Sequence, residues 1–313
     1  MPKTKVIVTG AAGFIGSWLA RTLVASGEYE VNVIVRPASD TRRIKDIWNK
    51  VNVYEGNLLD KNEIAKIVAA CSPRGVFHLA ASNIMSGKTA PDEEVLETNV
   101  LGTINVMNAA HDNKCNFFVQ TGTFTEYGKK NSPLKETDPS EPADLYSITK
   151  LMATLYGKGL ARASDLHVVT LRIFTPYGPD IQKGRLVYNL IEQALKNGDL
   201  NLTNPKVSRD FIFVEDLVKF IIEAGEKAEK YGGEIFNAGT GVKTMLGEIA
   251  ELVIKLTNSK SKVVAGKLES VPYDSEFWQA DMEKTYKNFQ WRPAHSLEQG
   301  LLKTIEWFKN SEI

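Results

Sequence analysis

The stretch from Lys5 to Gly16, which reads KVIVTGAAGFIG, constrains the fold of this chain more than any other. Val6–Thr9 is a run of apolar and β-branched residues of the kind that forms a buried strand. It leads directly into Gly10, Gly13 and Gly16, and an apolar pattern with helical spacing follows. Such a strand, glycine turn and helix start form a cradle for a dinucleotide pyrophosphate, because glycines let backbone N–H groups approach and the helix dipole favours the negative charge. The spacing G-x-x-G-x-x-G differs from the dehydrogenase G-x-G-x-x-G, so a tight turn with close helix–strand packing is the alternative.

Strand and helix patterns alternate along most of the chain. The expected strands are Val31–Val35, Val51–Glu55, Gly75–Ala81, Phe117–Thr121 and His167–Arg172. Helices are expected at about 61–70, 92–111, from about 144 onward, and at about 186–195, 244–257 and 297–308. This alternation predicts an α/β fold of the Rossmann type, with a doubly wound parallel sheet that is covered by helices on both faces.

The charge balance and the rare residue types narrow the possible partners. Of 313 residues, 38 are basic and 38 acidic, which gives no support for a nucleic-acid or membrane-surface partner. No apolar run approaches the ~20 residues of a membrane span, and the N-terminus leads directly into a strand, so we expect a cytoplasmic protein. Cys71 and Cys115 lack metal or redox spacing and the histidines are scattered, so no metal site is predicted. His78 lies in an apolar run, which favours a hydrogen-bonded core histidine over a catalytic one.

The residues after the second expected strand bear on the choice of dinucleotide. An acidic side chain there accepts hydrogen bonds from the ribose of NAD, whereas a cation suits the 2′-phosphate of NADP. The chain has Arg36 at this position, followed by Ser39, Arg42 and Arg43, which predicts a phosphate clamp and favours NADP. A solvated basic loop is the alternative, and NAD stays possible because Asp40 could turn toward a ribose.

A pair of acid–base residues follows the fifth expected strand. That strand ends in the hydroxyl-rich run Thr121–Thr125, and the helix that opens near residue 144 carries Tyr146 and Lys150. The four-residue offset places both side chains on one helical face, where the lysine ammonium favours the phenolate and lowers the pKa of the tyrosine. A nearby threonine hydroxyl orients a substrate oxygen toward the phenol. This pattern predicts acid–base work on a carbonyl or alcohol while a hydride moves to or from a nicotinamide, although most isolated Y-x-x-x-K pairs are surface residues.

Together these motifs resemble the extended short-chain dehydrogenases/reductases, in the branch of nucleotide-sugar epimerases, dehydratases and reductases. The resemblance rests on the glycines, Thr123, Tyr146-x-x-x-Lys150, the run His78–Ala81 and Asn99, and it extends over essentially the whole chain. In that family the tyrosine is the acid/base, the lysine holds the nicotinamide ribose and tunes the tyrosine, and the threonine contacts the sugar oxygen. The implied catalytic residues are therefore Thr123, Tyr146 and Lys150.

The resemblance also implies a domain division and a dimer. We expect an NAD(P)-binding Rossmann domain at 1–174 with a returning segment at about 211–238. A smaller C-terminal lobe for a nucleotide-diphosphate sugar is expected at 175–210 and 239–313. A homodimer is expected to form through the helices at about 92–111 and 145–163.

Binding residues are assigned by the same resemblance. Cofactor contacts are expected at Gly10, Ala12, Gly13, Phe14, Ile15, Gly16, Arg36, Ser39, Arg42, Asn57, Leu58, Leu79, Ala80, Ala81, Asn99, Thr121, Tyr146, Lys150 and Phe174. Substrate contacts are expected at Ser82, Thr123, Thr125, Thr175, Arg185 and Arg209. Arg209 belongs to the run SRDFIFVED and inherits a contact to the substrate diphosphate, with an ion pair to Asp210 or Asp216 as the alternative. Thr175 replaces an asparagine usual in the family, and Val271 replaces a second phosphate-binding arginine.

The residues after Thr123 discriminate among the reactions of the family. Dehydratases carry Asp-Glu there, whereas this chain has Phe124 and Thr125, which cannot supply that acid and base. Because Arg36 favours NADPH and net reduction, we predict an NADPH-dependent reductase of a 4-keto-6-deoxy nucleotide sugar. A nucleotide-sugar 4-epimerase with tightly bound NAD is the main alternative. A reductase of hydrophobic carbonyl compounds and a non-catalytic NADP-sensing protein are further alternatives.

Overall fold

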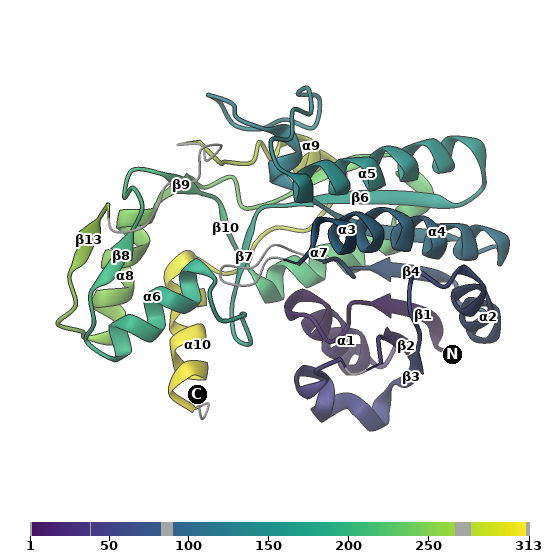
Figure 1. Cartoon of the computed structure of the whole chain (residues 1–313), viewed down its shortest axis with the longest axis horizontal. Coiled ribbons are helices and arrows are strands. Elements are labelled where there is room, and N and C mark those ends of the chain that lie inside the picture. The colour runs from purple at the N-terminus through teal and green to yellow at the C-terminus, as the bar shows by residue number, and fades with distance from the viewer. Residues whose placement is uncertain (1, 38, 83–89, 267–276, 311–313) are drawn as a thin grey trace.

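A computed structural model describes residues 2–37, 39–82, 90–266 and 277–310. Its main feature is a parallel sheet of seven strands in the order β11-β6-β5-β4-β1-β2-β3, shown in Figure 1. The strands are β1 (Thr4–Thr9), β2 (Tyr29–Val35), β3 (Asn52–Glu55), β4 (Gly75–His78), β5 (Phe117–Thr123), β6 (His167–Ile173) and β11 (Ile235–Ala238). The strand order reverses between β1 and β4, where the carboxyl ends of a doubly wound sheet open a crevice for ligands.

Helices cover both faces of this sheet, as the alternation of patterns predicts. On one face α1 (Phe14–Ser26) packs against α7 (Val214–Glu226), and on the other lie α2 (Lys61–Cys71), α4 (Thr103–Asp112) and α5 (Leu145–Ala163). Side chains alternate along β1, so Val6 and Val8 join the core beneath α1 and Ile7 joins the core on the opposite face. The predicted Rossmann-type fold is therefore confirmed.

The helix expected at 92–111 is interrupted in its first half. It consists of α3 (Asp92–Leu96), a π-helical segment η2 (Glu97–Gly102) and then α4. A π segment inserts an extra residue into the helical turn and often marks a functional position. Asn99, one of the predicted cofactor residues, lies in this segment and is buried.

A second group of elements lies to one side of the sheet (Figure 1). Its helices α6 (Leu186–Leu195), α8 (Leu246–Thr257) and α10 (Leu297–Asn310) pack together, and β8 (Leu200–Leu202) pairs with β13 (Val263–Ala265). Short strand pairs connect this group to the sheet. They are β7 (Thr175–Tyr177) with β10 (Phe211–Phe213), and β9 (Ser208–Arg209) with β12 (Thr244–Met245).

Several elements differ from the expectation. The basic loop after β2 contains a 3-10 helix, η1 (Arg42–Lys50), because Ile44 and Ile47 are buried against the core. The helix α7 was not predicted, and β4 ends at His78, three residues before its expected end. The remaining short elements are η3 (Phe124–Tyr127), η4 (Ala228–Lys230) and α9 (Glu283–Asn288). None of the helices within the described ranges combines the length and the hydropathy needed to cross a lipid bilayer.

Candidate functional site

Gly10 and Gly16 are required by the way β1 turns into α1. Gly10 has φ +72°, and a Cβ there would lie 2.6 Å from the amide nitrogen of Ala80. A Cβ on Gly16 would overlap the carbonyl oxygen of Gly10. In the same place the Leu79 amide donates to the Thr9 carbonyl at 3.2 Å. The ends of β1 and β4 are therefore held together at the reversal point of the strand order.

Gly13 leaves room for an anion at the start of α1. It is the N-cap of the helix and gives no side-chain hydrogen bond to the first turn. A Cβ on Gly13 would meet the Gly10 carbonyl oxygen at 3.1 Å and no other heavy atom within 4 Å. Backbone N–H groups at a helix start, with space in front of them, suit a phosphate. The glycine cradle of Gly10, Gly13 and Gly16 therefore fits the pyrophosphate of a dinucleotide.

The other predicted residues near the cradle differ in exposure. Ala12 and Ile15 are half-buried, whereas the Phe14 side chain is buried in the core, so only its backbone faces the cradle. Ala80 is half-buried and Ala81 is exposed at the end of the run after β4. Ala12 and Ile15 follow β1 and Ala80 and Ala81 follow β4, and these two strands are paired neighbours in the sheet.

The predicted phosphate clamp lies after β2. Arg36 Nη1 is 3.7 Å from Glu94 Oε1, and the Arg42 Nε is 3.2 Å from Asp40 Oδ2. The side chains of both pairs are largely exposed, and exposed pairs of this kind are weak. The Ser39 amide donates to the Arg36 carbonyl at 3.1 Å, which folds the loop back toward β2.

Arg43 has another role than the one predicted for it. Its Nε donates to the Asp180 carbonyl at 3.1 Å, which joins η1 to the loop after β7. Asp40 pairs with Arg42 and accepts its backbone N–H at 3.1 Å. The phosphate clamp of Arg36, Ser39 and Arg42 stays a prediction.

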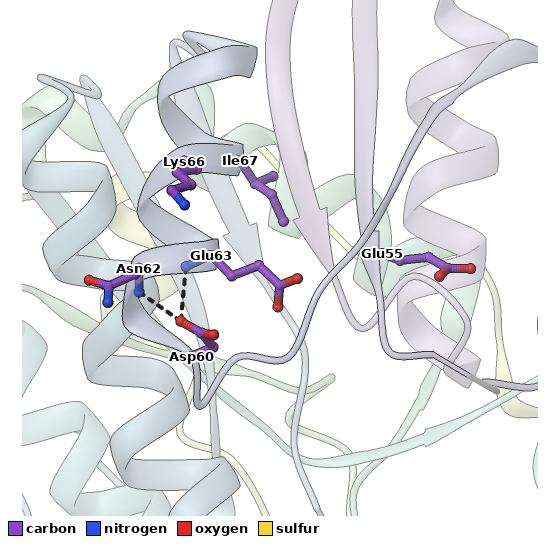
Figure 2. Close-up of a pocket in the computed structure, with 6 residues that line it drawn as sticks. All are labelled: Glu55, Asp60, Asn62, Glu63, Lys66 and Ile67. Atoms are coloured by element: carbon purple, nitrogen blue, oxygen red, sulfur yellow. Dashed lines mark hydrogen bonds between the residues drawn. The ribbon is translucent and has the colours of Figure 1, made fainter.

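Asn57 and Leu58 form the turn after β3. The Asn57 side-chain oxygen accepts the Leu59 amide at 3.1 Å, and the Leu58 carbonyl accepts from the Asn105 amide group at 2.9 Å. An acidic hollow lies beside this turn, as Figure 2 shows. It is lined by Glu55, Asp60, Asn62, Glu63, Lys66 and Ile67. None of the predicted catalytic residues lines it.

Asn99 fastens the segment after β4 to the start of α5. Its Oδ1 accepts the Ser82 amide at 2.8 Å, and its Nδ2 donates to the Ser82 carbonyl and to Thr149 Oγ1, both at 3.0 Å. The Ser82 hydroxyl donates to Glu94 Oε1 at 3.2 Å, the carboxylate that also faces Arg36. The amide of Asn99 thus makes its bonds within the protein, which positions Ser82.

Tyr146 and Lys150 lie one turn apart near the start of α5, which Asp144 caps. Lys150 is only 5% exposed, and no hydrogen bond or ion pair reaches its ammonium group in the part of the chain that the structure describes. The phenol of Tyr146 has no hydrogen-bond partner among those residues either. A buried cation and a phenol without partners fit a site that binds polar groups of a cofactor and a substrate.

The expected lowering of the Tyr146 pKa is wrong for this structure. Burial raises the pKa of Tyr146 to about 12, and the nearby Glu126 carboxylate acts in the same direction. Burial also lowers the pKa of Lys150 to about 8, so its ammonium group is still largely protonated near neutral pH. Desolvation is the largest contribution to the shift of each group. The charge of Arg185, at the start of α6, partly offsets the rise for Tyr146, so α6 brings a cation within electrostatic reach of the phenol.

Thr123 lies at the carboxyl end of β5, where it caps η3. Its Oγ1 is 3.0 Å from Thr125 Oγ1 and accepts the Thr125 amide at 3.3 Å. Ser147, next to Tyr146, donates to Thr125 Oγ1 at 2.6 Å. The structure therefore brings Thr123, Thr125 and the start of α5 together, as the motif predicts. Thr121 is half-buried two residues earlier in β5.

The remaining predicted contacts follow β6 and lie in the second group of elements. Phe174 is buried and stacks on Phe124 with ring centroids 5.4 Å apart. Thr175 is half-buried at the start of β7, Arg185 is exposed, and Arg209 is half-buried in β9. The motif around Val271 lies outside the described residues.

The two carboxylates considered as ion-pair partners of Arg209, those of Asp210 and Asp216, bond to other groups. The buried carboxylate of Asp210 accepts the amides of Thr240 and Gly241, both at 2.8 Å. Asp216 faces His295 Nδ1 at 3.0 Å. Both carboxylates are thus engaged elsewhere, and Asp210 serves to fix the turn after β11.

Comparison with known proteins identifies the family. The sequence model of the NAD dependent epimerase/dehydratase family matches residues 6–239. The chain belongs to this family. A UDP-N-acetyl-alpha-D-glucosaminuronate decarboxylase of Bacillus cytotoxicus is 32% identical to this family member over 327 aligned positions, with 99% of each chain covered.

Two solved structures of the family resemble the fold over nearly its full length. A UDP-glucose 4-epimerase of Thermotoga maritima with UDP-glucose has a TM-score of 0.89 and 26% identity, covering 98% of this chain and 99% of the other. A UDP-glucose 4-epimerase of Thermus thermophilus with NAD has a TM-score of 0.87 and 25% identity, covering 98% and 100%. The predictions of the extended short-chain dehydrogenase/reductase family and of an oxidoreductase-type enzyme are confirmed.

A buried ion pair beneath Thr123 in this epimerase/dehydratase-family chain was missed from the sequence. Glu126 Oε1 accepts the Thr123 amide at 2.9 Å, and its Oε2 lies 2.8 Å from Arg172 Nε. Both side chains are almost fully buried, and the Arg172 guanidinium lies 4.1 Å over the Tyr127 ring. Two features of the sequence could have predicted this pair. Glu126 follows Thr123 by three residues, and Arg172 lies in a mostly apolar strand. A paired, buried charge of this kind fixes the backbone at Thr123.

His78 is a structural residue, as predicted. It is 1% exposed, with its Nδ1 at 2.8 Å from Thr9 Oγ1 and its Nε2 at 2.9 Å from Thr103 Oγ1. Burial, aided by the Lys150 charge, lowers the pKa of His78 to about 3. The ring is therefore neutral and joins β1, β4 and α4.

Proposed function

We propose that this enzyme exchanges a hydride between a nicotinamide and a hydroxyl-bearing carbon of a nucleotide sugar, with Tyr146 moving the proton on the oxygen. The observation that carries this proposal is that hydroxyl contacts from Thr123 through Thr125 to Ser147 join the end of β5 to the start of α5, which carries Tyr146 and Lys150. The unpartnered phenol and ammonium of the described structure support it, because each offers a polar group to a ligand.

The side chains divide the chemistry among them. A nicotinamide, when bound, supplies or accepts the hydride at the reacting carbon. Tyr146, with a pKa of about 12, is protonated near neutral pH and donates its proton to a keto oxygen. Thr123 holds that oxygen, and the Lys150 ammonium holds polar groups of the bound ligands beside the phenol. The Phe124, Phe174 and Trp278 rings, in contact at 5.4 Å and 4.9 Å, help to exclude water next to Thr123.

A nucleotide sugar is the proposed substrate because Arg185 and the run SRDFIFVED around Arg209 offer cations that suit a diphosphate. Arg185 acts electrostatically on Tyr146, and Arg209 and Thr175 come from the strands that join the second group of elements to the sheet. We propose that residues 175–210 and 239–313 form the substrate lobe around these contacts, and that 1–174 with 211–238 bind the dinucleotide. Solved relatives with UDP-glucose or with UDP-glucuronic acid and NAD support this class of ligand.

The leading reaction is the NADPH-dependent reduction of a 4-keto-6-deoxy nucleotide sugar. Arg36 lies directly after β2, and its weak, exposed contact with Glu94 leaves it able to bind a 2′-phosphate. The test is oxidation of NADPH and of NADH by the purified protein with a panel of 4-keto nucleotide sugars. Preference for NADPH is expected, and Tyr146→Phe is expected to lower kcat by about 10²–10⁴-fold.

A nucleotide-sugar 4-epimerase with bound NAD is the second candidate, and the relatives favour it. Several solved relatives carry NAD, and the similar enzymes include UDP-glucose 4-epimerases. The same purified protein should then contain NAD and interconvert UDP-glucose and UDP-galactose without consuming a cofactor. Arg36→Asp would separate the candidates further, because it should weaken NADPH binding and leave NAD binding intact.

We also propose a homodimer through α3, η2 and α5. These elements pack side by side (Figure 1), and large apolar side chains on them are exposed. The exposed residues are Leu96, Leu101, Ile148, Met152 and Leu155. Apolar side chains gathered in this way on adjacent helices are typical of a protein–protein interface.

A further inference from the structure

A row of hydroxyl groups connects Thr123 to a carboxylate at the start of α5. Thr123 Oγ1 lies 3.0 Å from Thr125 Oγ1, and Ser147 Oγ lies 2.6 Å beyond it. The same Ser147 oxygen is 2.8 Å from Asp144 Oδ2. Thr123 and Ser147 are buried, whereas Thr125 and Asp144 are half-buried. Neither Ser147 nor Asp144 was singled out in the sequence.

Each hydroxyl group has one proton. The proton of Ser147 can point to either of two acceptors, Thr125 Oγ1 or Asp144 Oδ2. If this proton points to Thr125, the Thr125 proton is left to point to Thr123 Oγ1, which also accepts the Thr125 amide at 3.3 Å. Both lone pairs of Thr123 are then occupied, and its proton must point outward. In this arrangement Thr123 donates to a keto oxygen.

The opposite arrangement follows if the Ser147 proton points to Asp144. The carboxylate accepts and does not donate, so Ser147 Oγ becomes the acceptor for Thr125, and Thr125 becomes the acceptor for Thr123. Thr123 then has a lone pair free toward the substrate, which accepts the proton of a sugar hydroxyl. Every oxygen keeps its own proton, and only the O–H bonds rotate.

We propose that Ser147 and Asp144 are positioning residues that let Thr123 bind both redox states of the substrate, as a donor to the ketone and as an acceptor from the alcohol. This inference rests on the proposed function, because it assigns a substrate oxygen to Thr123. It adds two residues that contact neither the reacting atoms nor the cofactor.

The test is the equilibrium between alcohol and ketone on the enzyme, which is read from the absorbance of the reduced nicotinamide in the saturated complex. Asp144→Asn keeps an oxygen for the capping bond to the Ser147 amide and replaces the second acceptor with an NH₂ donor. The Ser147 proton then points permanently to Thr125. We expect the bound equilibrium to shift toward ketone and reduced cofactor by about 5–10-fold, the size of one hydrogen bond, with a matching rise in KM for the alcohol.

Ser147→Ala supplies the second arm, because it cuts the row at its centre. If Asp144 acts on Thr123 through the row of hydroxyl groups, which we call the relay, Asp144→Asn should not shift the bound equilibrium further when Ser147 is already alanine. Independent structural effects of the two substitutions would instead add. Asp60→Asn is the matched control, since Asp60 also caps a helix, α2, and its side chain accepts only the backbone amides of Asn62 and Glu63 among the described residues. Its bound equilibrium should equal that of the wild type, and thermal unfolding of all variants should stay within a few degrees.

The outcomes separate this inference from the proposed function. The assay uses the nucleotide sugar from the panel that is turned over fastest, and Tyr146→Phe is run in parallel. If Tyr146→Phe abolishes turnover and Asp144→Asn leaves the bound equilibrium unchanged, the relay is wrong and the proposed function stands. If no nucleotide sugar is turned over, or if Tyr146→Phe leaves turnover unchanged, both the proposed function and the inference about Ser147 and Asp144 are wrong.

Discussion

Lys150 is a cation held in a place that disfavours its charge. It is 5% exposed, no ion pair reaches it within the described residues, and burial lowers its pKa from 10.5 to about 8. Glu126 acts in the opposite direction through its charge, but does not restore the ordinary value. The protein therefore accepts a loss of stability at this residue, which is typical of a site that is completed by a ligand.

Replacing Lys150 with methionine should stabilise the protein and abolish its activity. Because the pKa is lowered on folding, the folded state carries fewer protons than the unfolded state between about pH 8 and 10.5. The unfolding free energy of the wild type therefore rises as the pH increases through this range. Below about pH 8 the cost of burying the charged ammonium group is fully present. We expect Lys150→Met to be more stable near neutral pH by on the order of 3 kcal/mol.

The measurement is urea unfolding of both proteins across this range of pH. Their difference in unfolding free energy should shrink as the pH rises above about 8. If the wild type is more stable than Lys150→Met at neutral pH, the prediction is wrong, because the ammonium group would then be stabilised by the protein without a ligand. The hydride-transfer assay should show at least a 10²-fold loss of kcat for Lys150→Met.

At the scale of elements, the turn from β1 into α1 is the most restricted part of the backbone. Gly16 lies against the carbonyl oxygen of Gly10, so no side chain fits without moving the backbone. Gly159 lies in α5, where a Cβ would have no heavy atom within 4 Å, and its φ is not positive. The two glycines therefore form a natural pair for testing the cradle.

Gly16→Ala should weaken cofactor binding and destabilise the fold, whereas Gly159→Ala should leave cofactor binding unchanged. The first change displaces the start of α1 from the phosphate position, for which we expect at least a tenfold rise in the Kd of the dinucleotide. The second replaces a glycine in α5, far along the chain from the cradle, and no contact within the described part of the chain opposes the added methyl group. Calorimetric titration with NADP and NAD, together with thermal unfolding, compares the two variants. Unchanged affinity in Gly16→Ala would rule out the cradle as the pyrophosphate site.

At the scale of the whole molecule, the apolar face of α3, η2 and α5 decides the oligomeric state that we expect. Leu155 is 57% exposed, and Leu101 and Met152 are 49% and 43% exposed. Leu302 on α10 is similarly exposed, at 48%, but lies in the second group of elements. A monomer would leave the larger face in water, which costs free energy in proportion to its area.

Leu155→Glu should convert the dimer to a monomer, and Leu302→Glu should leave it intact. A carboxylate buried in an apolar interface has no partner, so its desolvation opposes association. Light scattering at several concentrations gives the mass of each protein. A monomeric wild type, or a dimer that survives Leu155→Glu, would contradict this interface.

The sequence alone determined the fold and the elements that carry the residues of the candidate site. Strand and helix periodicities follow from which side chains are buried, and these are local patterns, so β1, α5 and the motifs at Gly10–Gly16 and Tyr146–Lys150 were placed correctly. The pair Glu126–Arg172 and the row from Thr123 to Asp144 were decided only by tertiary structure. Their members come from separate elements, and only the packing of β5, β6 and α5 brings them within hydrogen-bond distance. The pKa of Tyr146 rises for the same reason, because desolvation depends on the whole fold and not on spacing in the chain.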